Sequence, residues 1–77
     1  TAIAYLHQAL AMAQAVGDRF SEGTALGNLA ATYQAMAQPE TAVQYAQQHL
    51  EIALEIGDRA GEVRAREILG KAEIRKL

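Results

Sequence analysis

A three-residue motif occurs twice in this chain, separated by a step of forty positions. Gly17-Asp18-Arg19 returns as Gly57-Asp58-Arg59, and the same step aligns Tyr5 with Tyr45. A repeat of about 20 to 50 residues is typical of proteins built from stacked units, in which each unit completes its core against its neighbours. Because such arrays present surfaces rather than enclosed reaction centres, the repeat predicts a protein that binds another chain.

Composition limits both the fold and the partners. The 77 residues are enough for one small domain, and a chain rich in alanine with one proline and no cysteine is typical of an all-α protein without disulfides. A net charge of −2 does not provide the basic surface of a nucleic-acid-binding protein. The lack of cysteine is compatible with a reducing compartment, so we expect a cytoplasmic location.

Helix-start and helix-stop signals divide the chain into four predicted helices. Gly17 and Gly57 suit the left-handed residue that closes a helix, Asp18 suits an N-cap, and Pro39 suits a first helical turn. Short connections make neighbouring helices antiparallel. The helices are predicted at about residues 2–16, from the cap at 18 to about 37, at 39–56 and at 59–76.

The apolar pattern of the second and third predicted helices is carried by Leu26, Leu29, Ala30 and Tyr33, and by Ala42, Tyr45 and Ala46. These residues resemble the first and the second helix of a unit in the tetratricopeptide repeat (TPR) family. The forty-residue step exceeds the common unit of about 34 residues, and the segment from Leu50 to Arg59 is similar to the long repeats of the Pins/LGN class of spindle-orientation adaptors and of bacterial, notably cyanobacterial, arrays. The sequence departs from the family at Ala37, where a turn glycine is usual, and at His49, where a small residue is expected. The resemblance implies an all-α solenoid of antiparallel helix pairs, a four-helix fragment of a TPR-like superhelix.

The same register predicts three segments within a single domain over residues 1–77. Residues 1–19 correspond to the second helix of a repeat that lacks its first helix, residues 20–59 to one full repeat, and residues 60–77 to a C-terminal capping helix. Glu73 favours the cap because it replaces the tyrosine that packs against the next helix of an internal repeat. The apolar side of this last helix is expected to hold Val63, Ile68, Leu69 and Ala72.

The first predicted helix is apolar almost all round. It is shorter than the roughly 20 residues that span a bilayer, so we expect no membrane insertion. Its exposed side is instead expected to be covered by a second copy, in a homodimer or by exchange of helices.

The resemblance places a concave binding face on the second and fourth helices. Asn28 stands where peptide-binding members carry an asparagine, whose amide both donates and accepts hydrogen bonds; the alternative is a solvated polar residue. Arg64 is suited to an acidic side chain or a terminal carboxylate, or else belongs to a charged solvent face. Gly27 is expected to leave room for a bound backbone. The expected partner-binding residues are Thr24, Asn28, Ala31, Gln34, Arg64, Glu67 and Lys71.

Catalytic, cofactor and metal sites are not expected. His7 and His49 are not register mates and lack the helical spacing of a metal site, and we expect His49 to be a partly buried packing residue. Ser21 has no adjacent base to activate it. Arg19 and Arg59 are expected to face solvent or to contact a neighbouring repeat. The predicted function is therefore a non-catalytic scaffold that binds an extended peptide of a partner protein; the alternative is a structural module for capping or self-association.

Overall fold

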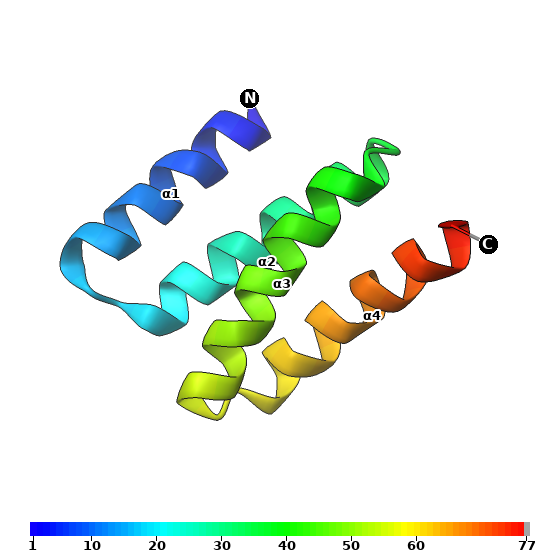
Figure 1. The fold of residues 1–77 in the computed structure, drawn as a ribbon. Helices are drawn as coiled ribbons and strands as arrows, with labels where there is room; N and C mark the ends of the chain where they lie inside the picture. Colours follow the sequence, from blue (N-terminus) through cyan, green and yellow to red (C-terminus); the bar gives the residue numbers. More distant parts are fainter. Residues whose placement is uncertain (77) are drawn as a thin grey trace.

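The structure, a computed structural model, describes the backbone of residues 1–76 and the side chains of residues 1–72. Four α-helices follow one another along this part of the chain: α1 (Ala2–Val16), α2 (Arg19–Ala35), α3 (Pro39–Ile56) and α4 (Arg59–Lys76) (Figure 1). The predicted all-α class is confirmed, with α2 ending two residues earlier than expected. The side chain of Glu73 lies outside the described residues, so the argument for a capping helix stays a prediction.

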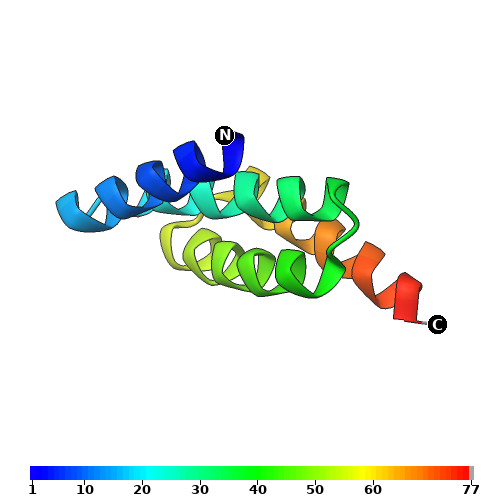
Figure 2. The ribbon, with the colours of Figure 1, turned by 90° about the horizontal axis from the view of Figure 1, so that it is seen from above.

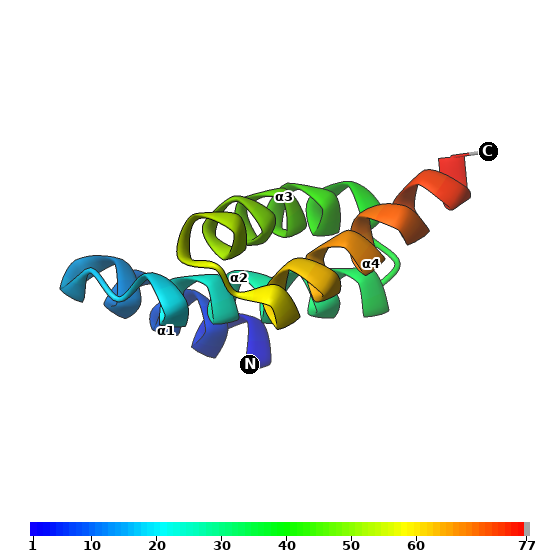
Figure 3. The same ribbon diagram turned by 90° about the horizontal axis from the view of Figure 1, so that it is seen from below.

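The helices α2 and α3 form the centre of the molecule. The first helix packs along α2, whereas α4 packs against α3 and also contacts α2. The outer helices α1 and α4 lie on opposite sides of the central pair (Figure 1), and α1 and α3 lie on different sides of α2 (Figures 2 and 3). The result is a thin body with extents of 40 × 30 × 14 Å.

The two Gly-Asp-Arg corners are equivalent bends. Gly17 and Gly57 adopt left-handed φ angles of 73° and 72°, which glycine reaches without a Cβ penalty. The Asp18 and Asp58 carboxylates each accept a hydrogen bond from the backbone N–H three residues further on, at 3.1 and 3.0 Å. Because these contacts are local, the same three residues produce the same reversal of the chain at both places.

The connection between α2 and α3 is built differently. Met36 caps α2, and Ala37 takes a left-handed φ of 58°. This is the position where the sequence departs from the family's glycine, and a left-handed conformation costs a residue with a Cβ about 1–2 kcal/mol. Pro39 begins α3, as predicted, where its missing N–H leaves no hydrogen bond unmade.

Small side chains make up most of the core, which lets the helices approach closely. Among the described side chains, only Leu26 and Leu29 are large and completely buried, and stacked Tyr33 and Tyr45 rings, 5.6 Å apart, pack against the alanine-rich centre. Val63 is more than half exposed, so its predicted place in the core is wrong: it lies on a side of α4 that neither α2 nor α3 covers. The remaining buried apolar residues are Ala13, Ala25, Ala30, Ala42, Ala46, Ile52, Ala53, Ala65, Ile68 and Ala72.

Candidate functional site

The helices α2 and α4 contact each other and carry all of the predicted partner-binding residues. All seven reach the surface, with Asn28 and Gln34 partly covered and the other five exposed. On α2 the spacing of three and four residues puts Thr24, Asn28 and Ala31 on one side of the helix. We call the surface formed by the following residues the candidate binding face: Thr24, Asn28, Ala31, Gln34, Arg64, Glu67 and Lys71.

Two residues of the candidate binding face meet across the helices. The Nη2 atom of Arg64 on α4 donates a hydrogen bond to Oδ1 of Asn28 on α2, at 3.3 Å. No carboxylate forms an ion pair with Arg64 among the side chains described. The Asn28 amide nitrogen and the remaining guanidinium N–H groups therefore present hydrogen-bond donors, an arrangement suited to carbonyl and carboxylate oxygens.

The Thr24 side chain is already bonded within its own helix. Its hydroxyl donates to the backbone carbonyl of Phe20, at 3.1 Å, so only its oxygen remains free to accept. Within the described side chains, no hydrogen bond or ion pair joins Gln34, Glu67 or Lys71 to the Asn28–Arg64 pair. The structure thus brings together two of the seven predicted residues by direct contact and leaves the others around them.

Beneath this face, His49 of α3 fills a space that glycines leave open. The imidazole is only 2% exposed. A Cβ placed on Gly27 would lie 2.6 Å from both Cε1 and Nδ1 of His49, and one on Gly61 would lie 3.0 Å from Nε2. The expectation that Gly27 leaves room for a bound peptide is therefore wrong, because the imidazole occupies that room. The packing role expected for His49 is confirmed, with deeper burial than expected.

The surroundings of His49 favour a neutral imidazole. Burial lowers its pKa below the ordinary value of 6.5, the positive charge of Arg64 acts in the same direction, and Asp58 opposes both. Its Nδ1 atom has no hydrogen-bond partner among the residues that the structure describes. Over the part of the chain that is described, no cluster of acidic, histidine or cysteine side chains is suited to a metal ion.

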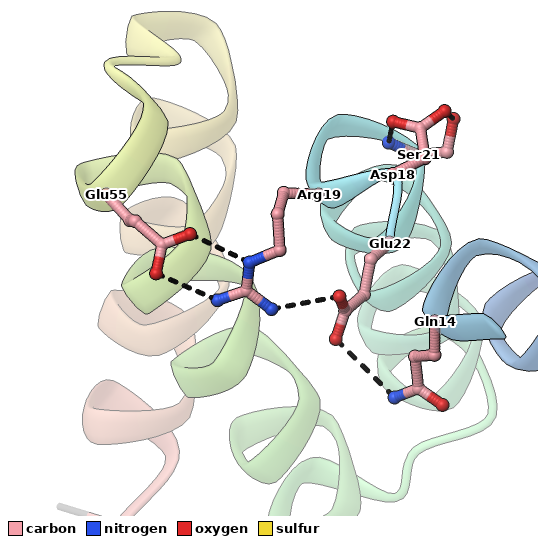
Figure 4. Close-up of polar contacts among 6 residues, drawn as sticks. All are labelled: Gln14, Asp18, Arg19, Ser21, Glu22 and Glu55. Atoms are coloured by element: carbon pink, nitrogen blue, oxygen red, sulfur yellow. Dashed lines mark hydrogen bonds and ion pairs between the residues drawn. The ribbon is translucent and has the colours of Figure 1, made fainter. Parts of the chain in front are cut away.

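A network of ion pairs and hydrogen bonds joins α1, α2 and α3 beside Asp18 (Figure 4). Arg19 donates to both carboxylate oxygens of Glu55, at 2.7 and 3.0 Å, and to Glu22 at 2.9 Å, while Gln14 of α1 donates to Glu22 at 3.4 Å. Bonding to Arg19 lowers the pKa of Glu55, and the two glutamates raise that of Arg19. Arg19 therefore ties the start of α2 to the end of α3.

Sequence reasoning missed Phe20, which lies on α2 one turn before Thr24. Its ring is 61% exposed. Residues 20, 24 and 31 share one side of a helix because they are four and seven residues apart. The helical period, extended by one turn from Thr24, would have found it.

Comparison with protein-family models identifies the tetratricopeptide repeat over residues 1–55. The match covers α1, α2 and α3 as far as Glu55, and the second Gly-Asp-Arg corner extends the register into α4. A search of curated proteins found no match. The likeness to the Pins/LGN class stays a prediction. No helix described in the structure has the length and apolar character needed to cross a membrane.

Proposed function

The chain belongs to the tetratricopeptide repeat family, a family of protein–protein interaction modules, and we propose that its candidate binding face holds an extended peptide of a partner protein. In this proposal residues 20–59 form one full repeat, preceded by a second helix at 1–19 and followed by a capping helix at 60–77. The face acts by binding alone, as a scaffold. The contact between Asn28 and Arg64 is the observation that supports it most strongly.

The donors of this pair suit the groups that every extended peptide carries. A peptide backbone offers carbonyl oxygens at regular intervals, and the Asn28 amide can bond them whatever the side chains are. Arg64 adds a planar, permanently charged group that pairs with a carboxylate through two parallel hydrogen bonds. The proposed partner segment is therefore extended and carries an acidic side chain or its own terminal carboxylate beside Arg64.

Replacing Asn28 by alanine tests the proposal. We expect Asn28→Ala to weaken binding of fluorescein-labelled acidic octapeptides by about fivefold, the worth of one hydrogen bond, as measured by fluorescence anisotropy at low salt. Gln48→Ala, at an exposed position of α3, serves as the control and should leave the affinity unchanged. Circular dichroism checks that both variants keep their helices. Equal affinities for Asn28→Ala and the unaltered chain would remove Asn28 from the site, and no binding of any acidic octapeptide would refute the proposal.

A second candidate function is self-association through α1. Tyr5, Met12 and Val16 are 70%, 70% and 73% exposed, and their spacing of seven and four residues aligns them along one side of the helix. An apolar stripe of this kind is typical of an interface. In this alternative the chain acts as a structural module, and a homodimer covers α1.

A further inference from the structure

We infer that Phe20 is the apolar contact of the candidate binding face, and that the partner segment carries an apolar side chain three or four residues from its acidic group. This inference rests on the proposed peptide binding and adds to it the kind of segment that is recognised. It makes Phe20 a specificity-determining residue, because acidic segments without the apolar side chain would bind less tightly.

The fold does not require an aromatic ring at position 20. The internal repeat shows this directly, because the residue after the first Gly-Asp-Arg corner is Phe20 and the residue after the second is Ala60. Both corners form the same bend and both are followed by a helix. Since alanine is sufficient for the bend, a ring that is 61% exposed at the equivalent place is available for a contact with another molecule.

The turn that carries Phe20 is held firmly by its neighbours. On one side of it in the sequence, the Arg19 guanidinium is bonded to Glu55 and Glu22; on the other, the backbone and hydroxyl of Ser21 both donate to Asp18, at 3.1 and 2.7 Å (Figure 4). A side chain on an ordered turn loses little freedom on binding, and an aromatic side chain with two rotatable bonds loses less than a long flexible one. Phe20 is therefore suited to be an anchor.

Helix geometry sets the spacing of the recognised groups. Phe20 and Asn28 are eight residues apart on α2, which at about 1.5 Å per residue is about 12 Å along the helix axis. An extended peptide advances about 3.2–3.4 Å per residue, so it covers this distance in three to four residues. An apolar side chain over Phe20 thus accompanies an acidic group at the Asn28–Arg64 pair.

Charge supports this choice of occupant. Arg64 forms no ion pair among the described side chains, and its bond to Asn28 leaves its positive charge uncompensated. A purely apolar partner surface would bury that charge unpaired, which is costly. A segment with both groups would place its apolar side chain on Phe20 and pair its acidic group with Arg64.

The experiment uses labelled octapeptides of serine that carry one aspartate and one leucine, with the separation varied from one to six residues in both orders. We expect the peptides with a separation of three or four to bind about tenfold more tightly than the same peptides with serine in place of leucine. Phe20→Ala should abolish this gain, so that the leucine and serine peptides bind with the same affinity. Leu54→Ala removes an apolar side chain of similar exposure, 55%, from α3 and should keep the gain.

The outcomes separate this inference from the proposed function. If acidic peptides bind but leucine adds nothing at any separation, or if Phe20→Ala retains the full gain, the role of Phe20 is refuted and peptide binding stands. If no acidic peptide binds, both fall. A Phe20→Ala variant that changes only the self-association measured by light scattering would also overturn the inference, because Phe20 would then contact a second copy. Phe20→Leu, which keeps an apolar group, should retain part of the gain.

Discussion

His49 illustrates how one large residue is accommodated where the repeat expects a small one. Space is provided by Gly23 and Gly27 on α2 and by Gly61 on α4, which all lie against the imidazole. Because glycines on α2 and α4 face the large histidine on α3, the three helices remain closely packed around it. It leaves a buried Nδ1 atom without a partner in the described part of the chain, and an unsatisfied buried polar atom costs about 1–3 kcal/mol.

Two glycine-to-alanine changes should therefore have opposite effects. Gly27→Ala places a methyl group 2.6 Å from His49, and such overpacking lowers the free energy of unfolding by about 1–3 kcal/mol. Gly70→Ala adds the same methyl group inside α4, where no described atom of another helix lies within 4 Å, and should raise the free energy of unfolding by about 0.5–1 kcal/mol through better helix propensity. Urea unfolding followed by circular dichroism measures both.

The same clash predicts a rescue. Combining Gly27→Ala with His49→Ala removes the imidazole that the new methyl group meets, so the cost of Gly27→Ala should largely disappear in the His49→Ala background. An unchanged cost would show that the methyl group disturbs something other than His49.

His49 also predicts how stability depends on pH. Because its pKa is lowered by folding, the unfolded chain binds the proton more tightly than the folded one. The free energy of unfolding therefore has its full value above the ordinary pKa of 6.5. It decreases as the pH falls from there through the lower pKa that His49 has in the folded protein. The free energy of unfolding changes by at most about 1.4 kcal/mol per pH unit for one proton.

Urea unfolding at about pH 7.5 and about pH 5.5 tests this dependence. His49→Ala should remove the part of the slope that belongs to this group. His7→Gln, which changes an exposed histidine, should retain it. Identical slopes for His49→Ala and the unaltered chain would contradict the assignment.

At the scale of the helices, the two kinds of connection differ in how well their residues suit the backbone. Both Gly-Asp-Arg corners place glycine at a left-handed residue, whereas the α2–α3 connection places Ala37 there. The corners also cap the following helix with an aspartate, whereas Gln38, the N-cap residue of α3, makes no side-chain capping hydrogen bond. The α2–α3 connection is thus the least favourable of the three.

Ala37→Gly should stabilise the protein. Glycine removes the Cβ penalty of the left-handed residue, and after subtraction of its greater freedom in the unfolded chain we expect a gain of about 0.5–1 kcal/mol in the free energy of unfolding. The reverse substitution at an equivalent left-handed residue, Gly57→Ala at φ 72°, should lower the free energy of unfolding by about as much or more. Thermal unfolding of the two variants measures the opposite shifts, and a loss of stability in Ala37→Gly would count against the strain at Ala37.

At the scale of the whole molecule, the thin shape leaves much of α1 uncovered. This helix packs along α2 and reaches α3 through the edge of His7 against the Tyr45 ring, 6.0 Å away. Its stripe of Tyr5, Met12 and Val16 faces away from these contacts. Burial of such a stripe between two copies would stabilise an assembly in proportion to the apolar area removed from water.

Self-association should therefore depend on protein concentration. We expect multi-angle light scattering to show a mass that rises from monomer toward dimer as concentration increases, and Met12→Glu to shift this rise to higher concentration. Leu54→Glu, which adds the same charge at an exposed apolar position of α3, serves as the control. A chain that stays monomeric at high concentration would rule out the α1 interface.

The sequence alone predicted the features that depend on neighbouring residues. The helix boundaries, the left-handed Gly17 and Gly57 and the Asp18 cap agree with the structure to within about two positions, because hydrogen bonds between residues at most five positions apart decide them. The family resemblance carried by residues such as Leu26, Leu29 and Tyr33 is also confirmed, by the family match over residues 1–55.

The tertiary structure decided the rest, because it depends on which side chains meet across helices. The partners Arg19 and Glu55, like Asn28 and Arg64, are 36 residues apart, and no local pattern specifies such a pair. The sequence predicted an open surface at Gly27, but in the structure His49 of α3 packs against this glycine. Local chemistry thus set the helices and their bends, and the contacts between helices determined which residues remain available to a partner.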